Sequence, residues 1–197
     1  MWVAAFGLWC ALGGRPPAAI AQIAAGGTAA IEDVSYRDDA GRRVLAIRTT
    51  VDAPVGEVWG LWTTSEGLRS WMAPVVGVEL EVGGVWEASY DRTARLGADG
   101  NIRNEILAHV PSRMFAMRVA AVPPGYPFPL ETVREAHTAY LFDPVSDAST
   151  RITVYGMGYG EGPLWDAMYD VGVQTTRYTL TEFRNRLLNG PVNWDAR

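Results

Sequence analysis

The segment from Val51 to Asp91 constrains the fold more than any other part of the chain. Asp52 and Pro54 suit the start of a helix, because an aspartate accepts hydrogen bonds from free N–H groups and a proline needs no partner in the first turn. The apolar residues that follow have the i, i+3, i+4, i+7 spacing of one helical face: Val55, Val58, Trp59 and Trp62. A short amphipathic helix after Pro54 is therefore predicted.

A second short helix is predicted directly after the first. Ser65 can cap it, and Pro74 prevents its continuation. Its apolar residues repeat the helical spacing: Leu68, Trp71 and Met72. The glycine pair Gly83–Gly84 then separates two apolar runs and predicts a hairpin. The segment thus reads as two helices in tandem followed by a sheet.

The remaining periodicity predicts an antiparallel sheet and a final helix. Arg43–Val51 alternates as a first strand after an Asp-Asp-Ala-Gly turn. After the two helices, turn signals separate six apolar and aromatic runs: 75–82, 85–91, 102–110, 114–122, 133–142 and 151–158. A proline-rich loop at 123–130 carries Tyr126 and Phe128, for which a lid, a membrane-touching tip and an ordered surface loop are all open, the last favoured. Helical spacing from Pro163 predicts one long helix that ends near Asn189, before Gly190–Pro191.

The predicted core-facing stripe of the final helix has bulky residues at its ends and small residues in its middle. Its ends are bulky: Trp165, Met168 and Tyr169, then Phe183 and Leu187. Its middle is small: Gly172, Thr176 and Thr179. Small residues on a core-facing stripe either leave room for a ligand or allow close packing on the sheet. Both interpretations remain open at this point.

Three motifs resemble a known family: A-P-V-G-E-V-W at 53–59, T-T-S-E-G-L-R-S-W-M-A-P at 63–74 and V-G-G-V-W at 82–86. With weaker matches at 106–114 and 149–159, the region 44–189 resembles the SRPBCC superfamily, in its bacterial branch similar to activators of heat-shock-protein ATPase. The resemblance implies an α+β helix-grip fold, with a curved antiparallel sheet wrapped around the long C-terminal helix and a cavity for apolar ligands between them. One departure is that Ala108 and His109 stand where the family usually has an acidic residue.

The candidate ligand-binding residues come from three sources. The family positions suggest Trp71, Met72, Trp86 and Tyr90. The parity of the strands suggests Ile106, Tyr140, Phe142, Ile152 and Val154. The stripe of the last helix adds Trp165, Met168, Tyr169, Gly172 and Thr176. Phe115 and Met117 also lie on one face of their predicted strand. The family resemblance, however, implies that the opposite face of this strand points inward.

Three functions are compatible with this pattern. The preferred one is binding of an apolar or amphipathic small molecule between the sheet and the last helix. An enzyme of the polyketide cyclase or dehydrase type is the alternative, with Glu105, Tyr90 or Tyr140 as acid or base. A protein-interaction module resembling chaperone-ATPase activators is the third.

Several function classes are disfavoured by composition. The formal charge of −5 and the pI near 5.1, without any basic run, disfavour nucleic acid as a partner. The chain contains no lysine, so Schiff-base and P-loop lysine chemistry are excluded. His109 and His137 are its two histidines, and we expect no metal, no cofactor and no assigned catalytic residue. Glu105 with His109, and Glu135 with His137, are interpreted as solvated pairs on strand faces.

The first residues predict export. Residues 1–21 end in Ala19-Ile20-Ala21, the small-x-small form of a signal-peptidase site, and the apolar run Val3–Leu12 is too short to span a bilayer. We therefore expect a periplasmic or secreted protein, or a cytoplasmic one if the segment is not a signal. No stable membrane insertion is expected after cleavage. Residues 22–31 are expected to form a flexible lead, 32–190 the domain and 191–197 a tail.

Overall fold

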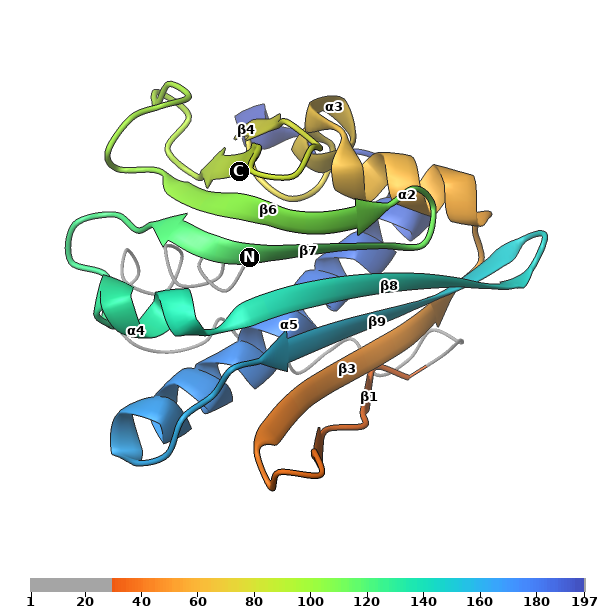
Figure 1. Ribbon diagram of the computed structural model, residues 1–197. Helices are drawn as coiled ribbons and strands as arrows, with labels where there is room; N and C mark the ends of the chain where they lie inside the picture. The colour runs from red at the N-terminus through yellow and green to blue at the C-terminus, as the bar shows by residue number, and fades with distance from the viewer. Residues whose placement is uncertain (1–29, 197) are drawn as a thin grey trace.

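One nine-stranded antiparallel sheet curves around a long C-terminal helix in the computed structural model, which describes residues 30–196 (Figure 1). The strands are β1 (Glu32–Asp33), β2 (Tyr36–Arg37), β3 (Arg43–Val51), β4 (Val75–Val78), β5 (Val85–Ser89), β6 (Ile102–Val110), β7 (Met114–Ala121), β8 (His137–Ser146) and β9 (Ser149–Met157). The helices are α2 (Val55–Thr63), α3 (Ser65–Arg69), α4 (Leu130–Glu135), α5 (Pro163–Asn189) and the 3-10 turn η2 (Trp194–Ala196). This is the predicted helix-grip fold.

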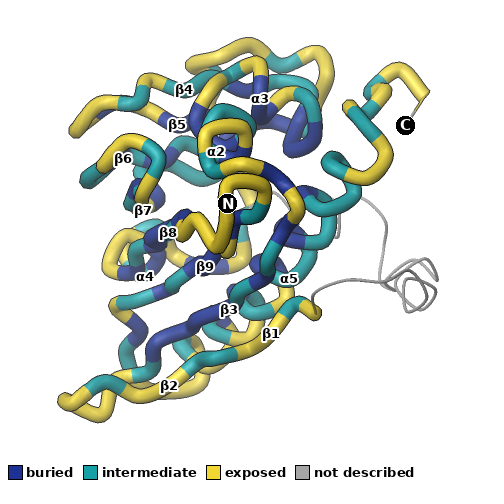
Figure 2. The backbone as a smooth tube through the Cα atoms, turned by 90° about the vertical axis from the view of Figure 1, so that its right-hand side faces the viewer, coloured by how far each residue is buried: buried dark blue, intermediate teal, exposed yellow. Residues whose placement is uncertain are grey.

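The order of the strands follows from short connections. β4 to β9 pair with their sequence neighbours as a meander, and β3 pairs with β9. β1 and β2 both add to β3. The tube view in Figure 2 shows β3 buried along most of its length. The predicted signal peptide 1–21 and most of the lead lie outside the described residues. No helix within 30–196 has both the length and the apolar character needed to cross a membrane.

The two helices after β3 form as predicted, but their caps differ. Pro54 occupies the cap position of α2, and no side chain caps that helix. Thr64 rather than Ser65 caps α3, with its hydroxyl accepting from the Gly67 N–H at 3.0 Å. The Ser65 hydroxyl instead accepts from the Val78 N–H at 3.0 Å. Ser65 therefore connects α3 to the edge strand β4.

A helix replaces part of a predicted strand. Residues 130–135 form α4 and β8 begins only at His137, so Glu135 does not share a strand with His137 as expected. The Arg134 guanidinium donates to the Ala120 carbonyl at 2.7 Å and holds α4 beside β7. Phe128 of the proline-rich loop before α4 is 6% exposed and packs into the hydrophobic core.

The side chains of β7 are oriented differently from the prediction. Phe115 is directly opposite Tyr140 of β8, so both side chains point to the same side of the sheet. Their rings stack with centroids 4.5 Å apart. Phe115 and Met117 are buried in the core, and the prediction that the alternate face of this strand points inward is wrong. The cross-strand register, which is a tertiary property, decides this orientation.

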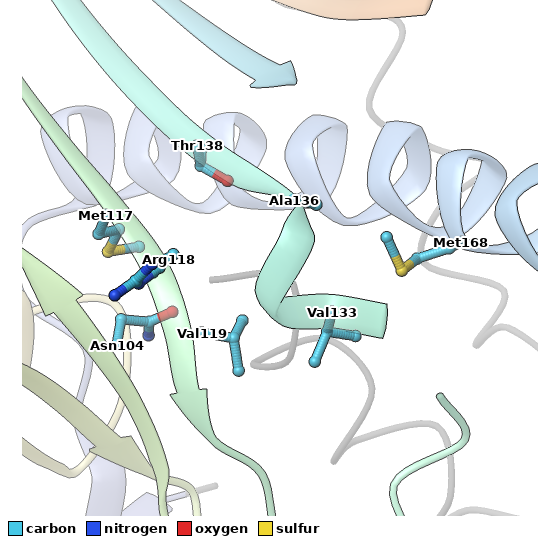
Figure 3. A pocket seen from close by; sticks show the side chains of 8 residues that line it. All are labelled: Asn104, Met117, Arg118, Val119, Val133, Ala136, Thr138 and Met168. Carbon is cyan, nitrogen blue, oxygen red and sulfur yellow. The ribbon is translucent and has the colours of Figure 1, made fainter. Parts of the chain in front are cut away.

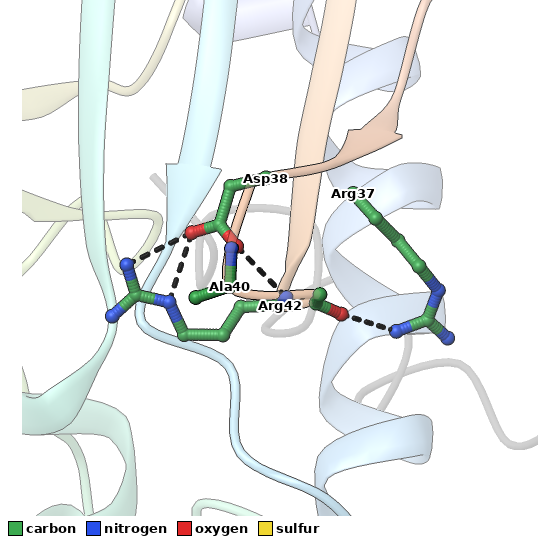
Figure 4. A network of polar contacts seen from close by, with 5 residues as sticks. Arg37, Asp38, Ala40 and Arg42 are labelled. Carbon is green, nitrogen blue, oxygen red and sulfur yellow. Dashed lines mark hydrogen bonds and ion pairs between the residues drawn. The ribbon is translucent and has the colours of Figure 1, made fainter.

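The turn before β3 has the predicted Asp-Asp-Ala-Gly chemistry. The Asp38 carboxylate accepts from the backbone N–H groups of Ala40 at 3.0 Å and Arg42 at 2.9 Å, and it pairs with the Arg42 guanidinium (Figure 4). The Arg37 guanidinium donates to the Gly41 carbonyl at 2.6 Å. The hydrogen bond from the Arg42 backbone is the main reason that the pKa of Asp38 lies below its usual value.

A buried carboxylate fixes the long connection between β5 and β6. Glu87 is 6% exposed, and its Oε1 accepts from the Gly97 N–H at 2.7 Å and the Asn101 amide at 2.5 Å. The Asn101 amide also donates to the Arg95 carbonyl at 2.7 Å. The connection is thus folded back onto the strand through one side chain.

Replacing Glu87 by alanine is expected to lower the free energy of unfolding by about 1–3 kcal/mol, because two donors lose their buried acceptor. Urea denaturation followed by circular dichroism measures the loss. Glu105→Ala is the control, since Glu105 makes an exposed ion pair with Arg118 and its removal should cost less than about 1 kcal/mol. Equal losses in the two variants would contradict this role of Glu87.

Candidate ligand-binding site

Most of the predicted ligand residues lie together in one hydrophobic core. Apart from Tyr90, the predicted site residues outside α5 are at most 5% exposed: Trp71, Met72, Trp86, Ile106, Tyr140, Phe142, Ile152 and Val154. They pack against the aromatic side chains of α2 and α5, with Trp62 and Trp71 centroids 4.8 Å apart. In the structure these residues lie together mainly because they pack against one another in the core.

The candidates on α5 divide into two groups. Met168, Gly172 and Thr176 are buried against the sheet. Trp165 and Tyr169 are partly buried near the start of the helix. There the Arg43 guanidinium lies 4.9 Å from the centroid of the Tyr169 ring. A second contact of Arg43, an ion pair at 2.8 Å, is with Asp166 of the same helix. The start of α5 is therefore attached to β3.

A small, partly open space lies beside the middle strands, between the sheet, α4 and α5 (Figure 3). We call it the niche, and it is lined by Asn104, Met117, Arg118, Val119, Val133, Ala136, Thr138 and Met168. Its volume of about 10 Å³ is close to the space that one water molecule occupies. Met168 is the one predicted site residue in its wall. The niche lies between the middle strands of the sheet and α5.

The lining of the niche is apolar with a few polar groups. Methionine, valine and alanine side chains make up most of it, and Thr138 adds a hydroxyl. Asn104 is 2% exposed, and its Nδ2 is buried without a hydrogen-bond partner. An apolar wall with few polar groups is typical of small-molecule sites. None of the residues that line it in the described part of the chain is a carboxylate.

A second recess lies under the C-terminal tail. It has a volume of about 20 Å³ and is lined by Trp71, Met72, Tyr90, Tyr178, Thr179, Glu182 and Trp194. The Trp194 indole donates to the Arg69 carbonyl at 2.6 Å, and the Val192 N–H donates to the Ser70 carbonyl at 2.8 Å. Three family-position candidates thus meet here, and the tail covers them.

The candidate acid and base residues do not converge. The Glu105 carboxylate pairs with the Arg118 guanidinium at 2.9 Å, in a partly exposed ion pair. Tyr140 is inside the core, where burial raises the pKa of its hydroxyl and makes the phenolate harder to form. Among residues 30–196 no cluster of three or more His, Cys, Asp or Glu side chains could hold a metal ion.

The comparisons with known proteins establish the family. The family model of the Activator of Hsp90 ATPase homolog 1-like protein matches residues 52–183. The chain belongs to this family. The matched region contains the 53–59, 63–74 and 82–86 motifs, so the predicted resemblance is confirmed. No curated protein sequence matches the chain.

Solved structures share the fold at low sequence identity. The Aha1 dimer from Colwellia psychrerythraea is 14% identical with a TM-score of 0.57, covering 75% of this chain and 97% of that one. CalU16 from Micromonospora echinospora is 20% identical with a TM-score of 0.54, covering 85% and 88%. Ms6760 from Mycobacterium smegmatis is 20% identical with a TM-score of 0.56, covering 83% and 100%. At these identities the likeness shows the helix-grip fold alone.

Sequence reasoning missed most of the niche for identifiable reasons. Val133 and Ala136 were expected near the start of a strand, whereas α4 and its last turn place them over the end of the sheet. Met117 was assigned to the wrong face of β7. Asn104 could have been noticed, because it lies on the same inward face of β6 as Ile106, where a polar residue is unusual.

Proposed function

We propose that this protein binds an apolar or amphipathic small molecule in the niche between the sheet and α5. The observation that supports the proposal is a small, mainly apolar space at this position, with the Asn104 amide in its wall. The family supports it, since a helix-grip fold places a cavity between these same elements. Fold alone does not specify a ligand, so the proposal rests on the site.

A ligand larger than one water molecule requires the niche to expand. Met117 from β7 and Met168 from α5 both line the niche, and methionine side chains change rotamer easily because they are unbranched. One side of the niche is formed by α4, a helix of six residues that follows a proline-rich loop. Short elements with few internal hydrogen bonds open at low free-energy cost. Displacement of α4 and of the two methionines is therefore the route to a larger cavity.

Binding can be tested by filling the niche. Ala136 lines it, so Ala136→Leu should weaken saturable binding of an apolar fluorescent probe such as Nile red by at least about tenfold, through steric exclusion. Ala167→Leu is the matched control, because Ala167 is exposed on α5. Fluorescence titration gives both affinities, and native mass spectrometry of the purified protein detects any retained ligand.

Two results would reject the proposal. One is the absence of saturable binding together with no retained ligand in the unmodified protein. The other is equal probe affinity in Ala136→Leu and Ala167→Leu, which would locate the probe elsewhere.

The name of the family supports a second candidate, an interaction with a chaperone ATPase. Recovery of an Hsp90-type chaperone by the purified protein, together with stimulation of its ATPase, would favour this function over ligand binding. Export through residues 1–21 would separate the protein from a cytosolic chaperone, and this is the reason for ranking it second.

A further inference from the structure

We propose that Trp194 is a built-in competitor for a second binding site, in the recess under the C-terminal tail. Displacement of residues 191–196, here called the tail segment, opens this site to a neutral, flat aromatic molecule with one N–H or O–H group. An indole or a naphthol has this chemistry. None of the described residues lines both this recess and the niche, so the inference does not depend on the proposed function.

The second recess reaches the hydrophobic core. Trp71 and Met72 line it, and they are only 2% and 5% exposed. Tyr90, which follows β5, and Tyr178 on α5 add two further aromatic rings. Trp194 of η2 completes the aromatic part of the lining. A mainly apolar, aromatic lining is typical of sites for small molecules.

Trp194 occupies the place of a ligand in this recess. Its Nε1–H donates to the Arg69 carbonyl at 2.6 Å. Arg69 is the last residue of α3, where the carbonyl groups have no partner within the helix. About 20 Å³ of space remains beside the indole. The indole thus shows the contacts that an external aromatic ring with one donor would make, and it does not fill the recess.

The tail segment lies on the surface. None of its residues is buried, and Figure 2 shows it in teal and yellow. The Val192 N–H donates to the Ser70 carbonyl at 2.8 Å, and the Asp195 carboxylate pairs with the Arg92 guanidinium. The two side chains of this ion pair are 85% and 51% exposed, so the pair adds little stability. Short surface segments without buried residues open at low free-energy cost.

The charge of the lining disfavours an anionic ligand. Glu182 is the one charged residue among those that line the recess, and it is partly buried. Its carboxylate accepts from the Asn185 amide at 3.1 Å. A carboxylate ligand would be repelled by this like charge. A neutral ring whose donor reaches the Arg69 carbonyl avoids the repulsion and replaces the hydrogen bond of Trp194.

Isothermal titration calorimetry with 2-naphthol, 2-methoxynaphthalene and 2-naphthoate tests this site. We expect Trp194→Ala to bind 2-naphthol at least about tenfold more tightly than the unmodified protein, because the internal competitor is gone. The ether has no donor, so it should bind Trp194→Ala about tenfold more weakly than the naphthol. The anion should bind most weakly.

Trp165→Ala is the matched control. Trp165 is also a partly buried tryptophan, but it does not line the recess. Its removal should therefore leave the affinity for 2-naphthol unchanged. Circular dichroism checks that both variants are folded.

Displacement of Trp194 is measured in the unmodified protein by proton–nitrogen correlation spectra of the tryptophan side chains. Trp194→Phe identifies the Nε1–H signal of Trp194 by its absence. Saturating 2-naphthol should move this signal to the position of a solvent-exposed indole, because the hydrogen bond to the Arg69 carbonyl is broken.

Three results would overturn the inference. The first is that Trp194→Ala binds 2-naphthol no better than the unmodified protein. The second is an equal rise in affinity in Trp165→Ala. The third is saturable binding of 2-naphthol to the unmodified protein that leaves the Trp194 signal unmoved. None of these results concerns the niche, which Ala136→Leu tests separately.

Discussion

Replacement of Trp62 by alanine is expected to lower the free energy of unfolding by about 3–5 kcal/mol, as is usual for a large buried aromatic side chain. Trp62 is 0% exposed. Its ring lies 4.8 Å from that of Trp71, 5.2 Å from that of Tyr140 and 5.2 Å from that of Phe183. One side chain thus joins α2, the turn after α3, β8 and α5, and its removal leaves a cavity where these four segments meet.

Urea denaturation of both proteins, followed by circular dichroism, measures this loss. For a domain of this size it corresponds to a fall in melting temperature of roughly 10 °C or more. Trp194→Ala is the control, because Trp194 is only partly buried in η2 and its main polar contact is with the Arg69 carbonyl. That variant should lose about 1 kcal/mol. Similar losses in the two variants would contradict the central position of Trp62.

The second large effect is expected for Gly67→Ala in α3. A Cβ built on Gly67 would lie 2.3 Å from the Gly60 carbonyl oxygen and 2.7 Å from the Leu61 Cα. Both are backbone atoms of α2, which cannot move aside without breaking the contact between the two helices. The substitution should destabilise the protein by on the order of 3 kcal/mol through overpacking.

Gly56→Ala in α2 is a control with the opposite expected sign. A Cβ at Gly56 meets no atom within 4 Å, so the better helix propensity of alanine should stabilise the protein by about 0.5–1 kcal/mol. Melting temperatures of the two variants give the comparison. A Gly67→Ala protein as stable as the unmodified one would show that the two helices do not approach as closely as the structure has them.

Elements with strong local signals could be predicted from the sequence. β3 begins at Arg43 and α5 spans Pro163–Asn189 as expected, because alternation, helical spacing and the terminal Gly190 all act within a few residues. α4 could not be predicted, since prolines obscure its short helical pattern and its contacts with β7 stabilise it. The cap of α3 was shifted by one residue because Ser65 finds a better partner in the edge strand β4.

The candidate site was less predictable than the fold. Of the residues that line the niche, Met168 was named from the stripe on α5, and Met117 was named with the wrong orientation. The others come from β6, β7, α4 and β8, which pairing and packing bring together. Parity on β6 offered a clue to Asn104, but parity cannot reveal whether a buried amide has a partner.

The amino-acid sequence by itself determined the family, the order of the elements and the composition of the inner faces, because periodicity, caps and motifs are local properties. Only the tertiary structure decided which of these buried residues surround an open space. The physical reason is that packing and hydrogen bonding depend on groups far apart in the chain. The Asn101 amide donates to Glu87 of the neighbouring strand β5, whereas Asn104 Nδ2 has no hydrogen-bond partner.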